Sequence, residues 1–94
     1  MVSTLEQWYL SRCDGEWEHA YGVRIDTLDN PGWHVRIDLI GTKKEGKILA
    51  REKIERDRND WVQYWVEASQ FQIACGPLNL SEAIEIFVTW FASD

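Results

Sequence analysis

The residues best suited to chemistry lie together between Asp14 and His19. The run Asp-Gly-Glu-Trp-Glu-His places three carboxylates and one imidazole in a short stretch. In an enzyme, His19 would transfer a proton and Asp14 or Glu16 would orient its ring. The alternation of residues 16–28 instead predicts a strand that puts His19 on its apolar side and turns Glu16 and Glu18 to solvent. We therefore expect a structural histidine beside an exposed acidic surface.

The rest of the sequence holds no pattern typical of a catalytic, phosphate-binding or metal site. Its serines and threonines lie outside nucleophile motifs, and its six glycines form no phosphate-binding loop. The residues that could bind zinc are too scattered for a compact ligand set: Cys13, His19, His34 and Cys75. We predict a protein that is not an enzyme and that needs neither metal nor cofactor.

The charge of the chain restricts its partners. Its 94 residues contain 16 acidic and 10 basic side chains, a net charge of −6, and residues 61–94 contain no basic side chain. A face that binds nucleic acid or an anionic membrane must be basic, so we expect neither partner. The sequence shows neither a signal peptide nor an apolar run of the roughly 20 residues that span a membrane. We expect a cytoplasmic protein with two reduced cysteines.

Two helices are expected, one near each end of the chain. Residues 3–13 carry apolar side chains at helical spacing, and Ser3 with Glu6 fits a capping box. The second helix begins at Asn79, which with Glu82 fits another capping box. Its apolar side chains recur at three- and four-residue steps and predict a wide stripe that packs on a sheet.

A hairpin is predicted from two alternating strands, residues 16–28 and 33–39, that flank an Asn-Pro-Gly turn. Residues that face each other in a hairpin point to the same side of the sheet, so the apolar parity requires a loop of odd length. Ile25 opposite Ile37 satisfies this rule. The same register brings together two pairs of opposite charge, namely Arg24 with Asp38 and Asp26 with Arg36.

Three further segments complete the predicted sheet. Residues 61–68 alternate with apolar side chains on both faces, which indicates an interior strand. Residues 71–75 are expected to form a short strand. Residues 48–57 fit an edge strand or a charged helix, and charged side chains at a sheet edge favour the strand. The fold expected over residues 1–94 is a single α+β domain, with an antiparallel sheet of four or five strands and both helices packed on one face.

Several segments of the chain are distinctive: WYLSRCDGEWEH at 8–19, YGV at 21–23, IDTLDNPGW at 25–33 and IDL at 37–39. Together they resemble the immunity protein 53 family, the antidotes encoded beside toxins in bacterial polymorphic toxin systems. The likeness is strongest over residues 7–42 and continues at Asp60-Trp61 and Asn79-Leu80. It implies an α+β fold and a cytosolic inhibitor that binds a cognate toxin, and its motif carries no catalytic residues.

A net charge of −6 suits a basic toxin, such as a nuclease, because acidic side chains can stand where phosphates would bind. Loops on a rigid sheet commonly carry binding residues. We therefore predict toxin contacts at the helix-to-strand connection and the hairpin tip: Asp14, Glu16, Trp17, Glu18, Asp29 and Trp33. The alternatives are a binding or scaffold module unrelated to toxins and an enzyme that uses His19. The oligomeric state is open, since an edge at residues 48–56 could pair with a second copy.

Overall fold

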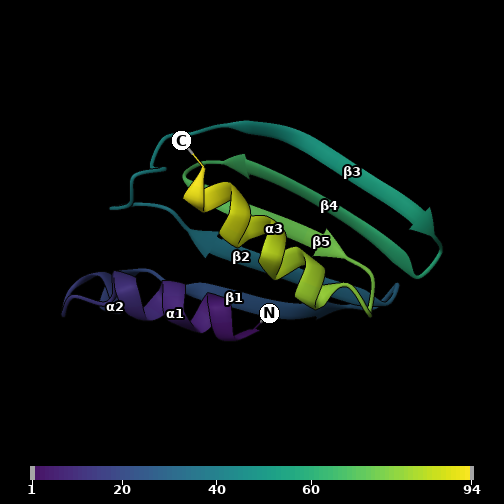
Figure 1. Cartoon of the computed structure of the whole chain (residues 1–94), viewed down its shortest axis with the longest axis horizontal. Helices are drawn as coiled ribbons and strands as arrows, with labels where there is room; N and C mark the ends of the chain where they lie inside the picture. The colour runs from purple at the N-terminus through teal and green to yellow at the C-terminus, as the bar shows by residue number, and fades with distance from the viewer. Residues whose placement is uncertain (1, 94) are drawn as a thin grey trace.

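The computed structural model describes residues 2–93, which form three helices and one five-stranded sheet (Figure 1). The elements follow one another along the chain as α1 (Val2–Arg12), α2 (Trp17–Ala20), β1 (Val23–Leu28), β2 (Gly32–Asp38), β3 (Leu49–Asp57), β4 (Asp60–Glu67), β5 (Gln70–Cys75) and α3 (Leu80–Ala92). The α+β prediction is confirmed, and the segment that could have been a strand or a helix is strand β3.

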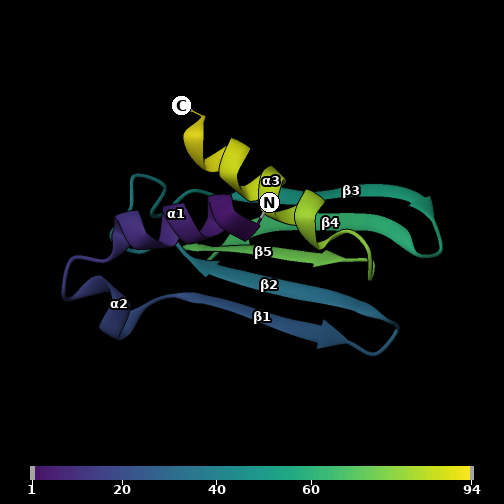
Figure 2. The same cartoon turned by 60° about the horizontal axis from the view of Figure 1, so that its bottom comes forward.

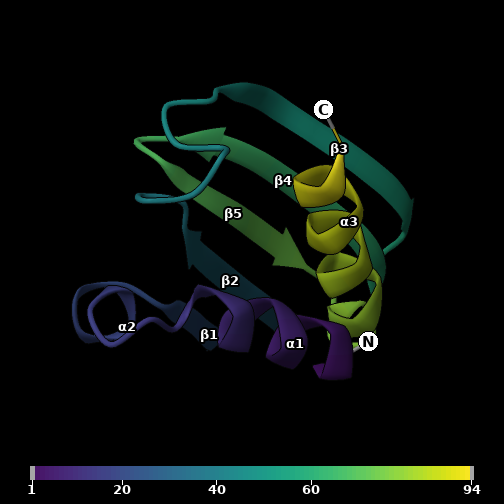
Figure 3. The same cartoon turned by 60° about the vertical axis from the view of Figure 1, so that its left-hand side comes forward.

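The last strand of the chain lies at the centre of the sheet. The strand order is β1-β2-β5-β4-β3, and every neighbouring pair is antiparallel. Strand β5 therefore lies between the hairpins β1–β2 and β3–β4 and pairs with one strand of each. Helices α1 and α3 both lie on one side of this sheet, as predicted (Figure 2), and Figure 3 shows α1 beside α3 on that side.

The core lies between the sheet and these two helices. Alternate residues of β5 (Phe71, Ile73 and Cys75) are fully buried, as expected for a central strand with one covered face. Phe87 of α3 packs edge-on against Phe71, with ring centroids 5.2 Å apart, and against Trp8 of α1 at 4.9 Å. Aromatic side chains thus join both helices to the sheet.

The β1–β2 hairpin pairs Ile25 with Val35, whereas the prediction paired it with Ile37. The loop of three residues confirms the predicted odd length. Because the register differs by two residues, each side chain keeps its predicted face. Strand β2 begins at Gly32, where an added Cβ would lie 2.2 Å from the carbonyl oxygen of Cys75. This close approach admits only glycine and fixes where β2 meets β5.

The predicted charge pairs of this hairpin are wrong in detail. Arg24 lies opposite Arg36 and not opposite Asp38, and Asp26 lies opposite His34. Arg36 nevertheless reaches Asp26 diagonally, with Nη2 and Oδ2 3.2 Å apart. Both side chains are substantially exposed, so this pair adds little to the free energy of unfolding.

The strand predicted from residue 16 begins only at Val23, because helix α2 comes first. The carboxylate of Asp14 accepts hydrogen bonds from two backbone N–H groups at the start of α2 and so favours a turn over a strand. The helical turn buries Trp17 and exposes His19. The prediction of a core-facing histidine is therefore wrong.

Neither predicted capping box forms. Ser3 lies inside α1, which already begins at Val2. Asn79 occupies the N-cap position of α3, but its side chain makes no cap hydrogen bond. Its amide instead donates to Asp60 and Glu82 at 2.9 and 3.0 Å. The Asn79 side chain therefore joins the start of α3 to the start of β4.

The two cysteines are both free thiols. Cys75 is fully buried in the core, and this burial raises its pKa to about 11. Cys13 is half-buried after α1, where its Sγ donates a hydrogen bond to the carbonyl oxygen of Tyr9.

Replacing Trp8 by alanine should lower the free energy of unfolding by about 3–5 kcal/mol, because the substitution leaves a cavity where α1, α3 and the sheet meet. Urea denaturation followed by far-ultraviolet circular dichroism measures the change. Leu10→Ala on the same helix is the control, since Leu10 is 72% exposed and should lose at most about 0.5 kcal/mol. Equal losses for the two variants would contradict the central role of Trp8.

Candidate protein-binding surface

The structure does not bring the six predicted contact residues together. Asp14, Glu16, Trp17 and Glu18 lie around α2, before the start of β1. Asp29 and Trp33 lie at the turn that follows the end of β1 and at the start of β2. A strand of six residues spans about 20 Å, and Figure 1 shows α2 and this turn at opposite ends of the sheet. The six residues therefore form two separate groups.

The acidic turn before α2 is held by its own carboxylates. Asp14 accepts hydrogen bonds from the N–H groups of Trp17 and Glu16, which lower its pKa. Glu18 accepts bonds from the N–H groups of Asp14 and Gly15 at 2.9 and 2.8 Å. Hydrogen bonds from its own N–H and from these two groups lower the pKa of Glu18. Both carboxylates therefore stay charged while they shape the turn.

Glu16 is the acidic side chain of this turn that remains available. It is exposed and has no hydrogen-bond or ion-pair partner among residues 2–93. The His19 side chain is exposed as well, and the Asp14 carboxylate is directed at backbone N–H groups rather than at the imidazole. Among residues 2–93, no carboxylate forms a hydrogen bond or an ion pair with the His19 imidazole.

The two tryptophans among the predicted contacts connect segments of the fold. Trp17 is 8% exposed, and its indole N–H donates to the carbonyl oxygen of Ile40 at 2.7 Å. The indole of Trp33 is half-buried and donates to the carbonyl oxygen of Pro77 at 3.0 Å. Neither ring stands free at the surface, so the exposed part of the predicted interface is acidic rather than aromatic.

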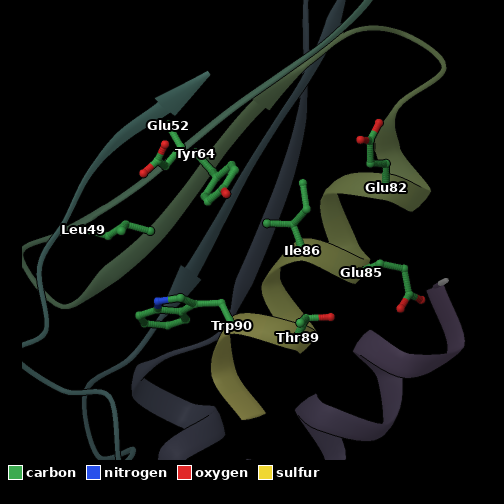
Figure 4. Close-up of a pocket in the computed structure, with 8 residues that line it drawn as sticks. All are labelled: Leu49, Glu52, Tyr64, Glu82, Glu85, Ile86, Thr89 and Trp90. Carbon is green, nitrogen blue, oxygen red and sulfur yellow. The ribbon is translucent and has the colours of Figure 1, made fainter. Parts of the chain in front are cut away.

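A groove that the sequence did not indicate lies between α3 and the β3–β4 hairpin, with a volume of about 430 Å³ (Figure 4). We refer to it as the α3–β3 groove. Four apolar or aromatic side chains and three glutamates line it together with a threonine: Leu49, Tyr64, Ile86 and Trp90, then Glu52, Glu82 and Glu85, and Thr89. In Figure 4, Ile86 and Trp90 extend from α3 toward Leu49 and Tyr64 on the strands.

The groove follows from how α3 packs. Phe87 and Trp90 of α3 contact Phe71 of the central strand β5, with ring centroids 5.2 and 5.0 Å away. Helix α3 also packs beside α1 through Trp8. Strand β3 therefore lies beyond the helices at the sheet edge (Figure 1), and the side chains between α3 and β3 are left partly exposed.

The three glutamates of the groove have different surroundings. Glu82 accepts a short hydrogen bond from Arg56, which also binds Asp60 at 2.9 Å. The hydrogen bonds to Asp60 and Glu82 raise the pKa of Arg56. The hydrogen bonds that Asp60 accepts from Arg56 and Asn79 lower the pKa of Asp60. Glu85 lies within 3.4 Å of the Thr4 hydroxyl of α1. Glu52 is exposed on β3, and none of the described residues that line the groove is basic.

The sheet face opposite the helices carries a second group of aromatic side chains. Trp65 of β4 lies under the guanidinium of Arg51, 3.8 Å from the ring centroid. The ring of His34 is stacked on Trp65 as well, with ring centroids 6.4 Å apart and ring planes 25° apart. His34 also bonds Gln72 at 3.2 Å. These side chains therefore cover one another across strands β3, β4, β5 and β2.

Two findings concern ligands and membranes. Across residues 2–93, no three His, Cys, Asp or Glu side chains are grouped so that they could hold a metal ion. No helix in the described part of the chain is both long and apolar enough to cross a membrane.

Replacing Asp14 by asparagine should destabilise the acidic turn at neutral pH, because the charged carboxylate is the stronger acceptor. Since the folded pKa of Asp14 lies below its ordinary 3.8, its contribution is complete above that value and disappears as the pH falls through the folded pKa. Thermal unfolding at pH 7 and at pH 2.5 should show a lower melting temperature for Asp14→Asn at pH 7 and a smaller difference from the unaltered protein at pH 2.5. Glu16→Gln, which removes the same charge, should match the unaltered protein at both.

Comparison with known proteins identifies the family of the chain. No curated protein and no solved structure matches the chain. The family model described as immunity protein 53 matches residues 2–92, which covers every helix and strand of the fold. A match of this extent includes the acidic turn, the hairpin and both sides of the α3–β3 groove. The chain belongs to the immunity protein 53 family.

Proposed function

We propose that the protein is an antidote that binds a cognate bacterial toxin in the cytoplasm and neutralises it stoichiometrically, without chemistry. The observation that carries the proposal is the match of the immunity protein 53 family over residues 2–92. The structure agrees with a binding role, because its exposed carboxylates are placed at turns and groove rims. His19, the residue best suited to acid–base chemistry, is exposed, and no carboxylate in the described part of the chain hydrogen-bonds to its ring.

The proposed toxin is basic, for example a nuclease. The chain carries a net charge of −6, and exposed acidic side chains stand at α2 and at the β1–β2 turn. Opposite charges accelerate encounter and reject partners of the same sign. Carboxylates on the antidote can then occupy positions where the toxin would bind phosphates.

The predicted contacts stay part of this proposal as two alternatives. One end of the molecule offers Asp14, Glu16 and Glu18, and the other end offers Asp29 and Trp33. A standard interface buries about 800 Å² on each partner, which covers one end and part of a sheet face. A toxin is therefore expected to use one of the two ends together with a neighbouring surface.

A tagged pull-down from lysate of the native cells should recover one basic partner at a 1:1 ratio. That partner should stop growth when expressed alone and be harmless when this protein is expressed with it. Recovery of a partner that is harmless on its own would instead favour a scaffold role. Recovery of an acidic or neutral toxin would keep the antidote role and contradict the charge argument.

Salt should weaken the complex. Between 50 mM and 500 mM sodium chloride, isothermal titration calorimetry should show affinity falling by at least about tenfold, because salt screens exposed charges. Titration in 50 mM sodium chloride, with sucrose added to the osmolality of the 500 mM sample, controls for changes in water activity. Affinity that is independent of salt would mean that apolar contacts, and not the acidic surface, dominate binding.

A further inference from the structure

We propose that the α3–β3 groove is the docking site for an arginine side chain of the toxin. The inference rests on the proposed antidote function and names the part of the partner that the groove would take. It depends on the groove's shape, its apolar floor and the sign of its charge.

The floor of the groove suits the methylene stem of a long basic side chain. Leu49, Tyr64, Ile86 and Trp90 are each half-buried, so they offer apolar surface that is still exposed. Arginine buries its three methylene groups along such surface while its charged end reaches a polar rim. The planar guanidinium also stacks on aromatic rings, which lysine does less well.

The rim has the charge that a guanidinium needs. Glu52 projects from β3 on the same side of the sheet as Tyr64, with which it is paired across the strands. Glu82 lies at the far end of the groove on α3 (Figure 4). No described residue lining the groove is basic, so nothing in the lining neutralises Glu52.

Two residues of the groove lining already contact basic side chains of the same chain. Arg56 donates to Glu82 and Asp60 at one end of α3. Near the other end, the ammonium of Lys44 lies 4.8 Å from the centre of the Trp90 ring. Both a groove carboxylate and a groove aromatic ring therefore accept positive charge from outside the lining, whereas the Glu52 carboxylate has no hydrogen-bond or ion-pair partner among residues 2–93.

Charge also decides which occupant is favoured. A second copy of this chain would bring a net charge of −6 to a groove rimmed by glutamates, and like charges placed together are repelled. A basic toxin brings the complementary charge. We therefore assign the groove to the toxin and take pairing between copies as an outcome that would overturn the assignment.

Two glutamates of strand β3 provide a matched test. Glu52 faces the groove, whereas Glu55 is paired with Trp61 and faces the opposite side of the sheet. Both are exposed, so Glu52→Gln and Glu55→Gln change the net charge equally and should fold alike, as circular dichroism can verify. Calorimetry with the toxin recovered by the pull-down should show an affinity loss of about tenfold for Glu52→Gln and less than about twofold for Glu55→Gln. Equal losses would overturn the groove assignment while leaving the antidote function intact.

A probe that does not depend on the toxin separates the two proposals. Titration of ¹⁵N-labelled protein with acetylated tri-arginine amide should shift the signals of Leu49, Glu52, Ile86 and the Trp90 indole in a saturable manner. The neutral tri-citrulline analogue should not shift them, and Glu52→Gln should reduce the shifts more than Glu55→Gln does. Shifts centred on Asp14–Glu18, shifts spread evenly over the surface, or a concentration-dependent dimer at the groove would overturn the assignment. Binding of tri-arginine at the groove without binding of any toxin would overturn the antidote function and the assignment of the groove to a toxin, and would leave only a site for arginine.

Discussion

The contact of Phe87 with Trp8 and Phe71 is the interaction on which the rest of the structure depends. Through these three rings, α1, α3 and the central strand β5 share one apolar core. A chain of 94 residues has room for little more than this one core. The two helices therefore lie where their aromatic side chains contact those of β5. The rest of that sheet face is covered less completely.

Two helices gathered at the centre of a five-stranded sheet leave its edges exposed. At one edge, β3 lies beyond α3, and the α3–β3 groove results. Beside the opposite edge strand, β1, a second groove runs along α1 and is lined by Tyr9 and Ile25. The first groove differs from the second in having three glutamates rather than one. Packing therefore determines where the grooves form, and the sequence of β3 and α3 determines the charge of the first one.

Much of the fold could be predicted because local patterns in the chain agree with the final packing. Alternating apolar residues located the strands, and the stripe that contains Phe87 and Phe91 located α3. The predictions from these patterns were wrong where a polar side chain forms hydrogen bonds other than those that the pattern implied. Asp14 binds backbone N–H groups and converts a predicted strand into α2, and Asn79 turns toward Asp60 instead of capping its helix.

The candidate site could be predicted only in part, since its members come from distant segments. The acidic turn is contiguous in sequence and could therefore be predicted. Glu52 and Trp90 are far apart in sequence, and only the strand order of the sheet places them in the same groove. The lack of basic residues after position 60 was a signal of an acidic surface, yet it could not place that surface beside β3. The environment of Lys44 could not be predicted either. By sequence it lies in a polar loop, but in the fold it is 5% exposed and lies over the Trp90 ring.

The central position of the last strand has a consequence for how the protein is made. During synthesis α1 and the two hairpins emerge first, and the hairpins stay apart until β5 emerges between them and α3 completes the core. An isolated two-stranded hairpin is marginally stable at best in water, so the sheet closes only when nearly the whole chain is available. Copies cut short during translation would lack a core and be open to proteases. A cell that makes this protein would therefore contain mostly complete, folded molecules. Truncated copies that could compete for a partner would be few.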